Sequence, residues 1–205
     1  MKKKCAVWDC DEVLLDHIGG LYWFVKDHYD IHPTSQYPVS YDLRAWLGGI
    51  TSVEVQEIIK HFNQNSYEFG LLEPLEHNTV QIMQELRDKF PDVHFAVLTK
   101  SGTRGHGEVL RKVNLMNAFG NLFDDIIIVE MQESKKAALQ KLQNQYDVKF
   151  LVDDYIKNIE TAMDLDIPAV MMRSSHNLDY KNNHDGFKYC NNWTDLRLEI
   201  YSMLK

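Results

Sequence analysis

The feature that most constrains the fold is a series of short, unbroken apolar runs. The runs are Cys5–Trp8, Val93–Leu98, Ile126–Val129, Phe150–Val152 and Ala169–Met172. Strands that are covered on both faces read as continuous apolar runs, because neither face meets water. The pattern therefore predicts an α/β fold, in which a Rossmann-like open parallel sheet of about five strands has helices on both faces.

The segments between the runs carry apolar residues at the spacing of a helix. The stripes are Val80, Met83, Leu86 and Phe90; Val109, Leu110 and Val113; Ala138, Leu139, Leu142 and Tyr146; Ile159, Ala162 and Met163; and Leu196, Ile200 and Met203. In an amphipathic helix such a stripe faces the core. We therefore expect a helix at each of these places.

One interval between two predicted strands is too long for this alternation of strands and helices. The gap between Trp8 and Val93 far exceeds a single crossover helix. Two stripes at helical spacing lie inside it: Leu21, Phe24 and Val25, and then Val55, Ile58, Ile59 and Phe62. We expect residues 16–75 to form a small helical domain that follows the first strand, and residues 1–15 and 76–205 to form the core domain.

Composition limits the partners and the compartment. The formal charge of -8 argues against general affinity for a nucleic-acid backbone, so nucleic acid is not an expected partner. No apolar run approaches the roughly 20 residues that span a bilayer, so we expect a cytoplasmic protein with no membrane partner. The cysteines form no C-x-x-C pair and fit a reducing compartment, with Cys10 expected to be a small buried residue.

The first apolar run ends in two carboxylates, Asp9 and Asp11. Residues two apart on a strand point to the same side, so both can face one spot. Polar residues also follow the other runs: Thr99 and Lys100, then Asp153 and Asp154, with Lys135 near the start of a helix. Ligands of open α/β sheets bind beyond the carboxyl ends of the strands. Carboxylates, a hydroxyl and an ammonium at that edge suit Mg²⁺ together with a phosphate.

These residues, in this order, resemble the haloacid dehalogenase (HAD) superfamily of phosphohydrolases. The matching pieces are Asp9-x-Asp11-x-Val13, Thr99, Lys135 in "SKKAAL", and "VDDYIKN" with Asp153, Asp154 and Asn158. Each piece alone is weak, but four in sequence at strand or helix ends agree with one another. The resemblance implies that residues 16–75 form a C1-type helical cap over the active site.

The resemblance also implies roles for the site residues. Asp9 is the expected nucleophile that forms an aspartyl-phosphate, and Asp11 the expected acid and base. Thr99, Lys100 and Lys135 are expected to bind the phosphate, although Lys136 is an alternative to Lys135. The expected cofactor is Mg²⁺, bound by Asp9, the Asp11 backbone carbonyl and Asp154, with Asp153 close by. Asp154 is preferred because Asn158 follows it by four, as in the family's acidic motif.

The expected partner is a small, soluble, phosphorylated molecule. The tail "MMRSSHNLDY", followed by Trp193 before a terminal helix, weakly resembles the 5′(3′)-deoxyribonucleotidase branch. A deoxynucleoside monophosphate is therefore the first hypothesis, with its base stacked on Tyr22, Trp23 or Trp46. Alternatives are a sugar phosphate, a nucleic-acid 3′-phosphate end, or a HAD-fold protein that binds without catalysis. The sequence does not indicate whether the protein is a monomer or a homodimer.

Overall fold

A computed structural model describes residues 2–178 and 186–205 of the chain. Its centre is a parallel sheet of six strands in the order β3-β2-β1-β4-β5-β6. The strands are β1 (Lys4–Trp8), β2 (His94–Thr99), β3 (Asp125–Ile128), β4 (Asp147–Asp153), β5 (Ala169–Met172) and β6 (Phe187–Cys190). The predicted α/β class and the five predicted strands are confirmed.

The sixth strand, β6, was not predicted. Its sequence FKYC contains a charged residue, and only its first and last residues are buried, with Lys188 exposed between them. It pairs only with β5, at the edge of the sheet, where one side of a strand can meet water. Strand β6 lacks the unbroken apolar run that marks the other five strands, which include β3 at the opposite edge.

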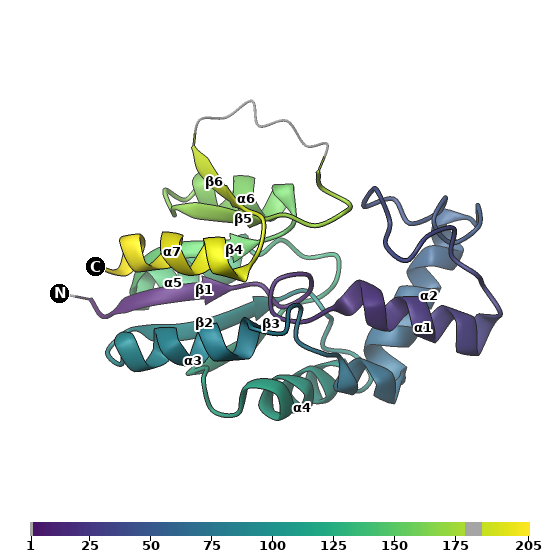
Figure 1. Cartoon of the computed structure of the whole chain (residues 1–205), viewed down its shortest axis with the longest axis horizontal. Helices are drawn as coiled ribbons and strands as arrows, with labels where there is room; N and C mark the ends of the chain where they lie inside the picture. The colour runs from purple at the N-terminus through teal and green to yellow at the C-terminus, as the bar shows by residue number, and fades with distance from the viewer. Residues whose placement is uncertain (1, 179–185) are drawn as a thin grey trace.

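Helices cover both faces of the sheet, as Figure 1 shows. One face packs against α3 (Thr79–Lys89), α4 (Gly107–Phe119) and α7 (Trp193–Leu204), and the other against α5 (Lys136–Gln145) and α6 (Ile156–Met163). All five predicted helices are present. None of the described helices is long and apolar enough to cross a membrane.

Helix α4 does not bury the predicted stripe. Val109 is 62% exposed and Val113 is 45% exposed. The buried face of this helix instead carries Arg111 and Asn114 together with apolar residues. The expectation for this stripe was wrong, because α4 turns a polar face inward toward the site described below.

The long interval after β1 forms its own group of helices, beyond the carboxyl ends of the strands (Figure 1). It consists of α1 (His17–Tyr29), α2 (Ser52–Asn65) and the short 3₁₀ helix η1 (Tyr67–Leu71). Leu21, Phe24 and Phe62 are buried between these helices. Thr51 begins α2 with a reciprocal capping box to Glu54. We call residues 16–75 the cap from here on.

Candidate active site

Asp9 lies at the carboxyl end of β1, between the ends of two neighbouring strands. Trp8 is in register with Val97 on one side and with Val152 on the other. The Asp9 amide donates a hydrogen bond to the Val152 carbonyl at 2.8 Å. This register places Asp9 beside the strand ends that carry Thr99 and Asp153, as the positions of these residues in the sequence predicted.

Lys135 lies between two of the carboxylates. Its Nζ is 2.7 Å from Asp9 Oδ1 and 2.7 Å from Asp153 Oδ2, and the whole side chain is buried. Burial alone would lower the pKa of Lys135, but Asp153 and Asp9 together raise it, so the ammonium stays charged. Lys136 is exposed on the first turn of α5. Of these two lysines, Lys135 is therefore the one that contacts the carboxylates at this edge of the sheet.

Three buried carboxylates meet at this edge. Asp9, Asp153 and Asp154 each offer an oxygen within 4.8 Å of the other two. Burial and then the neighbouring Asp153 charge raise the pKa of Asp9 well above its ordinary value, although Lys135 opposes them. Burial also raises the pKa of Asp154. A divalent cation prefers oxygen ligands and would relieve this repulsion, so the cluster fits one.

The two adjacent acids of β4 have different partners. Asp153 uses both oxygens: Oδ2 accepts from Lys135, and Oδ1 accepts from the Tyr155 amide and from Asn158 Nδ2, each at 3.0 Å. Asp154 Oδ2 accepts from His176 Nε2 at 2.7 Å. Asn158 thus serves Asp153, whereas the sequence argument had linked it to Asp154. Asp154 still has an oxygen without a hydrogen-bond partner among the described residues.

Asp11 lies outside the cluster, because its side chain turns toward α4. Its Oδ1 forms an ion pair with Arg111 Nη2, and the Arg111 side chain is fully buried. The guanidinium also lies 3.1 Å from Cys10 Sγ and packs on the Phe69 ring, 4.2 Å from its centroid. Burial is the largest influence and acts to raise the pKa of Asp11, but the charge and hydrogen bond of Arg111, together with the charges of His17 and Lys135, lower the pKa overall. The sequence reasoning missed Arg111.

Two buried hydroxyl groups lie at the carboxyl end of β2. Thr99 Oγ1 and Ser101 Oγ are buried and have no hydrogen-bond partner among the described residues. An unpartnered buried hydroxyl is unfavourable, so both atoms suit an anion with many acceptor oxygens. Lys100, between them, is partly exposed, and burial followed by the Lys135 charge lowers its pKa. The predicted phosphate ligands are therefore near one another, with Ser101 as an addition.

The turn after Asp9 is fixed from behind by Trp193. The Trp193 indole donates to the Val13 carbonyl at 2.8 Å, and its ring stacks on Trp8 at 5.8 Å between centroids. Within the turn, Glu12 adopts a φ of 56°, a left-handed conformation that favours glycine. Glu12 is buried, and its Oε1 accepts from the Ile18 amide at 2.9 Å at the start of α1. Trp193 therefore has the anchoring role that a buried tryptophan commonly has.

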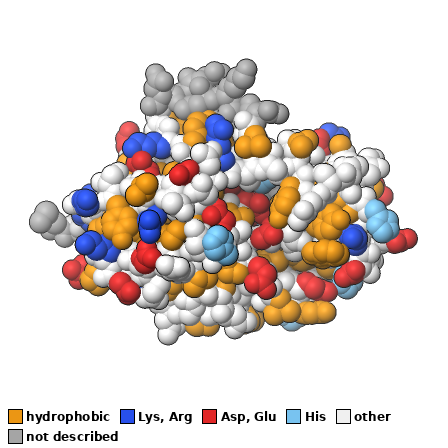
Figure 2. Space-filling view, in the orientation of Figure 1, with side chains coloured by type: hydrophobic (Ala, Val, Ile, Leu, Met, Phe, Trp, Pro, Cys, Tyr) orange, Lys and Arg blue, Asp and Glu red, His pale blue; other side chains and the backbone are white. Residues whose placement is uncertain are grey.

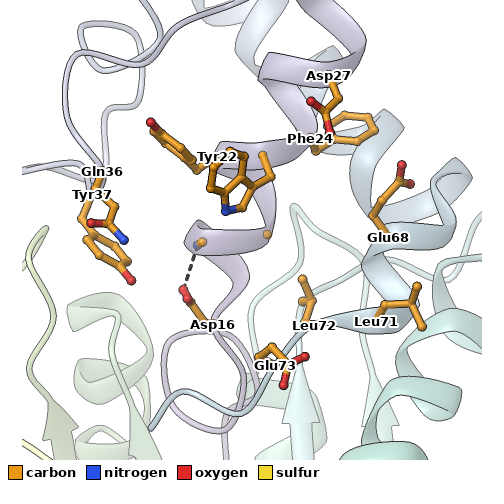
Figure 3. Close-up of a pocket in the computed structure, with 13 residues that line it drawn as sticks. Asp16, Tyr22, Phe24, Asp27, Gln36, Tyr37, Glu68, Leu71, Leu72 and Glu73 are labelled. Carbon is orange, nitrogen blue, oxygen red and sulfur yellow. Dashed lines mark hydrogen bonds between the residues drawn. The ribbon is translucent and has the colours of Figure 1, made fainter.

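The cap contributes an open cavity of about 580 Å³ (Figure 3). Its walls are aromatic and acidic and include Tyr22, Trp23, Tyr37, Asp27 and Glu73. Among the described residues that line the cavity there is no lysine or arginine, but Lys26 Nζ lies 4.4 Å from the Trp23 ring centroid and 4.9 Å from that of Tyr22. Figure 2 shows acidic side chains gathered near the middle of this face, where the core domain meets the cap.

The cavity adjoins the turn that carries Asp11. In Figure 3 the Tyr37 hydroxyl points toward Asp16, which begins α1 by accepting from the Gly19 amide at 2.7 Å. Burial, followed by the charges of Asp16 and Glu12, raises the pKa of Tyr37. Because Glu12 directly follows Asp11, one end of the cavity lies close to the turn that carries Asp11.

The three aromatic residues predicted to stack on a base differ in their exposure to solvent. Trp23 is 60% exposed and Tyr22 is half-buried, and both line the cavity. Trp46 is buried, and its indole donates to the Ser35 carbonyl at 2.8 Å, so it is not a stacking surface. Of the tail "MMRSSHNLDY", residues 179 and 180 lie outside the described residues.

Comparison with known proteins gives the fold. No protein-family model matches the sequence, and no curated protein matches it significantly. A haloacid dehalogenase-like hydrolase of Streptococcus pneumoniae superposes with a TM-score of 0.61 at 13% identity, covering 98% of both chains. The L-2-haloacid dehalogenase PA0810 gives 0.59 at 13% identity, covering 98% of this chain and 99% of the other.

Protein tyrosine kinase A of Mycobacterium tuberculosis superposes with a TM-score of 0.68 at 16% identity, covering 97% of this chain and 98% of the other. The chain therefore has the fold of haloacid dehalogenase-like hydrolases. By their names these similar proteins include a dehalogenase and a kinase, so the fold leaves the reaction open and the site must decide it.

Proposed function

We propose that this protein is a phosphomonoester hydrolase that works through an aspartyl-phosphate on Asp9. The observation that carries the proposal is the position of the buried Lys135 ammonium, which is 2.7 Å from the Asp9 carboxylate. The unpartnered Thr99 and Ser101 hydroxyls lie at the end of β2, the strand next to the one that Asp9 follows. An anionic phosphoryl group placed there would meet a nucleophile, a cation and two hydroxyl donors.

In the proposed reaction, Asp9 attacks phosphorus, and the bond from phosphorus to the leaving oxygen breaks. Asp11 gives its proton to that oxygen, then takes a proton from the water that hydrolyses the aspartyl-phosphate. The ion pair with Arg111 holds Asp11 ionised. We propose that Asp11 turns away from Arg111 and takes up a proton from water, because it has left the charge that lowers its pKa. It gives this proton to the leaving oxygen, and the resulting carboxylate acts as the base in the second step.

The Asp9, Asp153 and Asp154 cluster would hold the proposed Mg²⁺. When bound, the ion would neutralise charge on the carboxylates and on the transferred phosphoryl group. The Lys135 ammonium, the Thr99 hydroxyl and the exposed end of Lys100 would orient the phosphoryl oxygens.

We propose a deoxynucleoside monophosphate as the first candidate substrate. The exposed Trp23 ring and the half-buried Tyr22 ring in the cap cavity could stack on a flat base, which contributes roughly 1–3 kcal/mol. In this proposal residues 16–75 act as a C1-type cap that shields the leaving group from water. The acidic lining disfavours a second phosphate on the leaving group.

A substrate screen tests the proposal. Purified protein with Mg²⁺ is offered deoxynucleoside monophosphates, sugar phosphates, a 3′-phosphorylated oligonucleotide and a 2-haloacid, and phosphate or halide release is measured. We expect phosphate release that a chelator abolishes and that Ca²⁺ inhibits, because the larger Ca²⁺ shell disturbs the in-line geometry. Preference for sugar phosphates would overturn the nucleotidase proposal alone. Halide release, or no turnover on any substrate, would overturn the phosphatase proposal.

A further inference from the structure

The loop after β5 places a buried histidine against the acidic cluster. His176 Nε2 is 2.7 Å from Asp154 Oδ2, and the residue is 7% exposed. An ionised carboxylate can only accept a hydrogen bond, so Nε2 carries the hydrogen. Ser174 Oγ lies 2.9 Å from Nε2 and 3.2 Å from Nδ1. The imidazole is thus in contact with Asp154 on one loop and with Ser174 on its own loop.

The backbone of Asp154 is held as well, by two different parts of the chain. Asn177 Nδ2 donates to the Asp154 carbonyl at 2.9 Å and to the Met172 carbonyl at 2.9 Å, which joins the loops after β4 and β5. The Tyr41 hydroxyl donates to the same Asp154 carbonyl. Tyr41 belongs to the cap, in the segment between α1 and α2.

Tyr41 also contacts the histidine itself. Its ring lies edge-on to His176, with 4.5 Å between ring centroids, and edge-on to Tyr155 at 4.6 Å. Close by, Ser175 Oγ donates to the Pro38 carbonyl at 2.7 Å, a second hydrogen bond between the core domain and this cap segment. The cap segment therefore rests directly on the loops that present Asp154.

We infer that His176 and Tyr41 are positioning residues that hold Asp154 ready to bind a divalent cation, so that the cap contributes to metal affinity. His176 engages one carboxylate oxygen, and the described residues leave the other without a hydrogen-bond partner. Hydrogen bonds that orient a ligand group in this way commonly change metal affinity 10- to 100-fold. The inference rests on the proposed function only for the metal at this cluster.

The first experiment measures Mg²⁺ binding to the purified protein by isothermal titration calorimetry without any phosphate compound. We expect His176→Leu to raise the dissociation constant for Mg²⁺ about 10- to 100-fold. His176→Gln retains a donor near the Nε2 position, so we expect it to remain within about 3-fold of the unchanged protein. The matched control is His28→Leu, which breaks a similar histidine–carboxylate pair, to Glu68 at 2.8 Å, within the cap.

The second experiment tests the contribution of the cap. Tyr41→Phe keeps the ring and removes only the hydroxyl, so we expect Mg²⁺ binding to weaken about 2- to 10-fold, the range for one hydrogen bond. Tyr29→Phe is its control, since the Tyr29 hydroxyl contacts His61 within the cap. Circular dichroism melts accompany every variant, because folded protein is required for the comparison.

The outcomes separate this inference from the proposed function. If folded His176→Leu binds Mg²⁺ as the unchanged protein does, the pair only joins two loops and the inference fails, whatever the protein hydrolyses. The inference also fails if the unchanged protein binds no Mg²⁺, or if His176→Gln is as weak as His176→Leu. Mg²⁺ binding with the expected order of variants, but without phosphate release in the screen, would leave the inference standing and overturn the proposed function.

Discussion

Asp9 and Asp11 are separated by one residue, yet their surroundings have opposite charge balances. Asp9 shares the single buried ammonium of Lys135 with Asp153, and Asp154 lies beside them. Asp11 has the guanidinium of Arg111 to itself. The first region therefore has an excess of negative charge in a buried place, whereas the second is a closed neutral pair. An incoming cation is favoured in the first region only.

The largest expected effect tests the region around Asp9, which has the excess of negative charge. Asp9→Asn keeps the shape of the side chain but removes the nucleophile, so we expect no measurable phosphate release and a folded protein. The measurement is turnover of an aryl phosphate with Mg²⁺, together with a circular dichroism spectrum. Asp147→Asn, at the opposite end of the sheet on β4, is the control and should retain full activity. Normal turnover by Asp9→Asn would remove Asp9 from its role.

The next effect tests the neutral pair. Asp11→Asn cannot exchange a proton with the leaving oxygen or with water, so we expect a rate reduced by roughly 10²–10⁴. Because hydrolysis of the intermediate is also slowed, mass spectrometry of the quenched protein should detect a phosphorylated Asp9. If the rate is unchanged, Asp11 serves only as the partner of Arg111.

The pair itself can be broken from the other side. Arg111→Met leaves the Asp11 charge without its buried partner, so we expect the free energy of unfolding to fall by about 3–5 kcal/mol. The double variant Asp11→Asn/Arg111→Met should be less destabilised than the sum of the two single changes, since no unpaired charge remains. Urea denaturation measures both. Additive losses would contradict a direct ion pair, and Arg44→Met, in an exposed pair with Asp42, serves as the surface control.

The smallest expected effect is a difference in pH dependence. The raised pKa of Asp9 means that the folded chain holds a proton that the unfolded chain releases above about pH 4. The stability associated with Asp9 is thus complete below that pH and declines as the pH rises through the raised pKa. With chelator present, we expect the free energy of unfolding of Asp9→Asn to increase relative to that of the unchanged protein as the pH rises.

The stability associated with Asp11 changes with pH in the opposite direction, because the pKa of Asp11 is lowered. Its contribution is complete above about pH 4 and is lost only as the pH falls through the lowered value. The cost of Asp11→Asn should therefore stay constant between about pH 5 and pH 8. Urea denaturation across this range compares the two variants, and parallel curves for both would contradict the contrast between the two regions.

The sequence predicted the parts of the fold that follow from continuous apolar runs. Strands β1 to β5, the helices and the gathering of Asp9, Thr99, Lys135 and Asp153 near the carboxyl ends of the strands are all recovered, because a parallel sheet brings strand ends together regardless of loop length. Edge strand β6 was missed, since its exposed positions remove the apolar signal.

Arg111 and His176 show why the rest of the site could not be predicted. The exposed Val109 and Val113 gave α4 an apolar stripe on the wrong side, and a single arginine within a helix normally indicates a solvated surface. The segment "MMRSSHNLDY", which contains His176, indicated only a class of substrate and no partner for the histidine. Both residues act through partners far along the chain, in Asp11 and Asp154, and local spacing does not show such pairings.

The hydrogen bond from Trp193 to the Val13 carbonyl has a consequence for biosynthesis. The two residues are 180 positions apart, so the turn after Asp9 is among the first segments to be synthesised, and Trp193 is among the last of the described residues. During synthesis at about 5–20 residues per second, roughly 10–40 seconds pass before Trp193 can bind this turn. A ribosome-bound chain halted before residue 193 would therefore contain the residues of its sheet strands and yet lack the hydrogen bond that fixes the turn after Asp9.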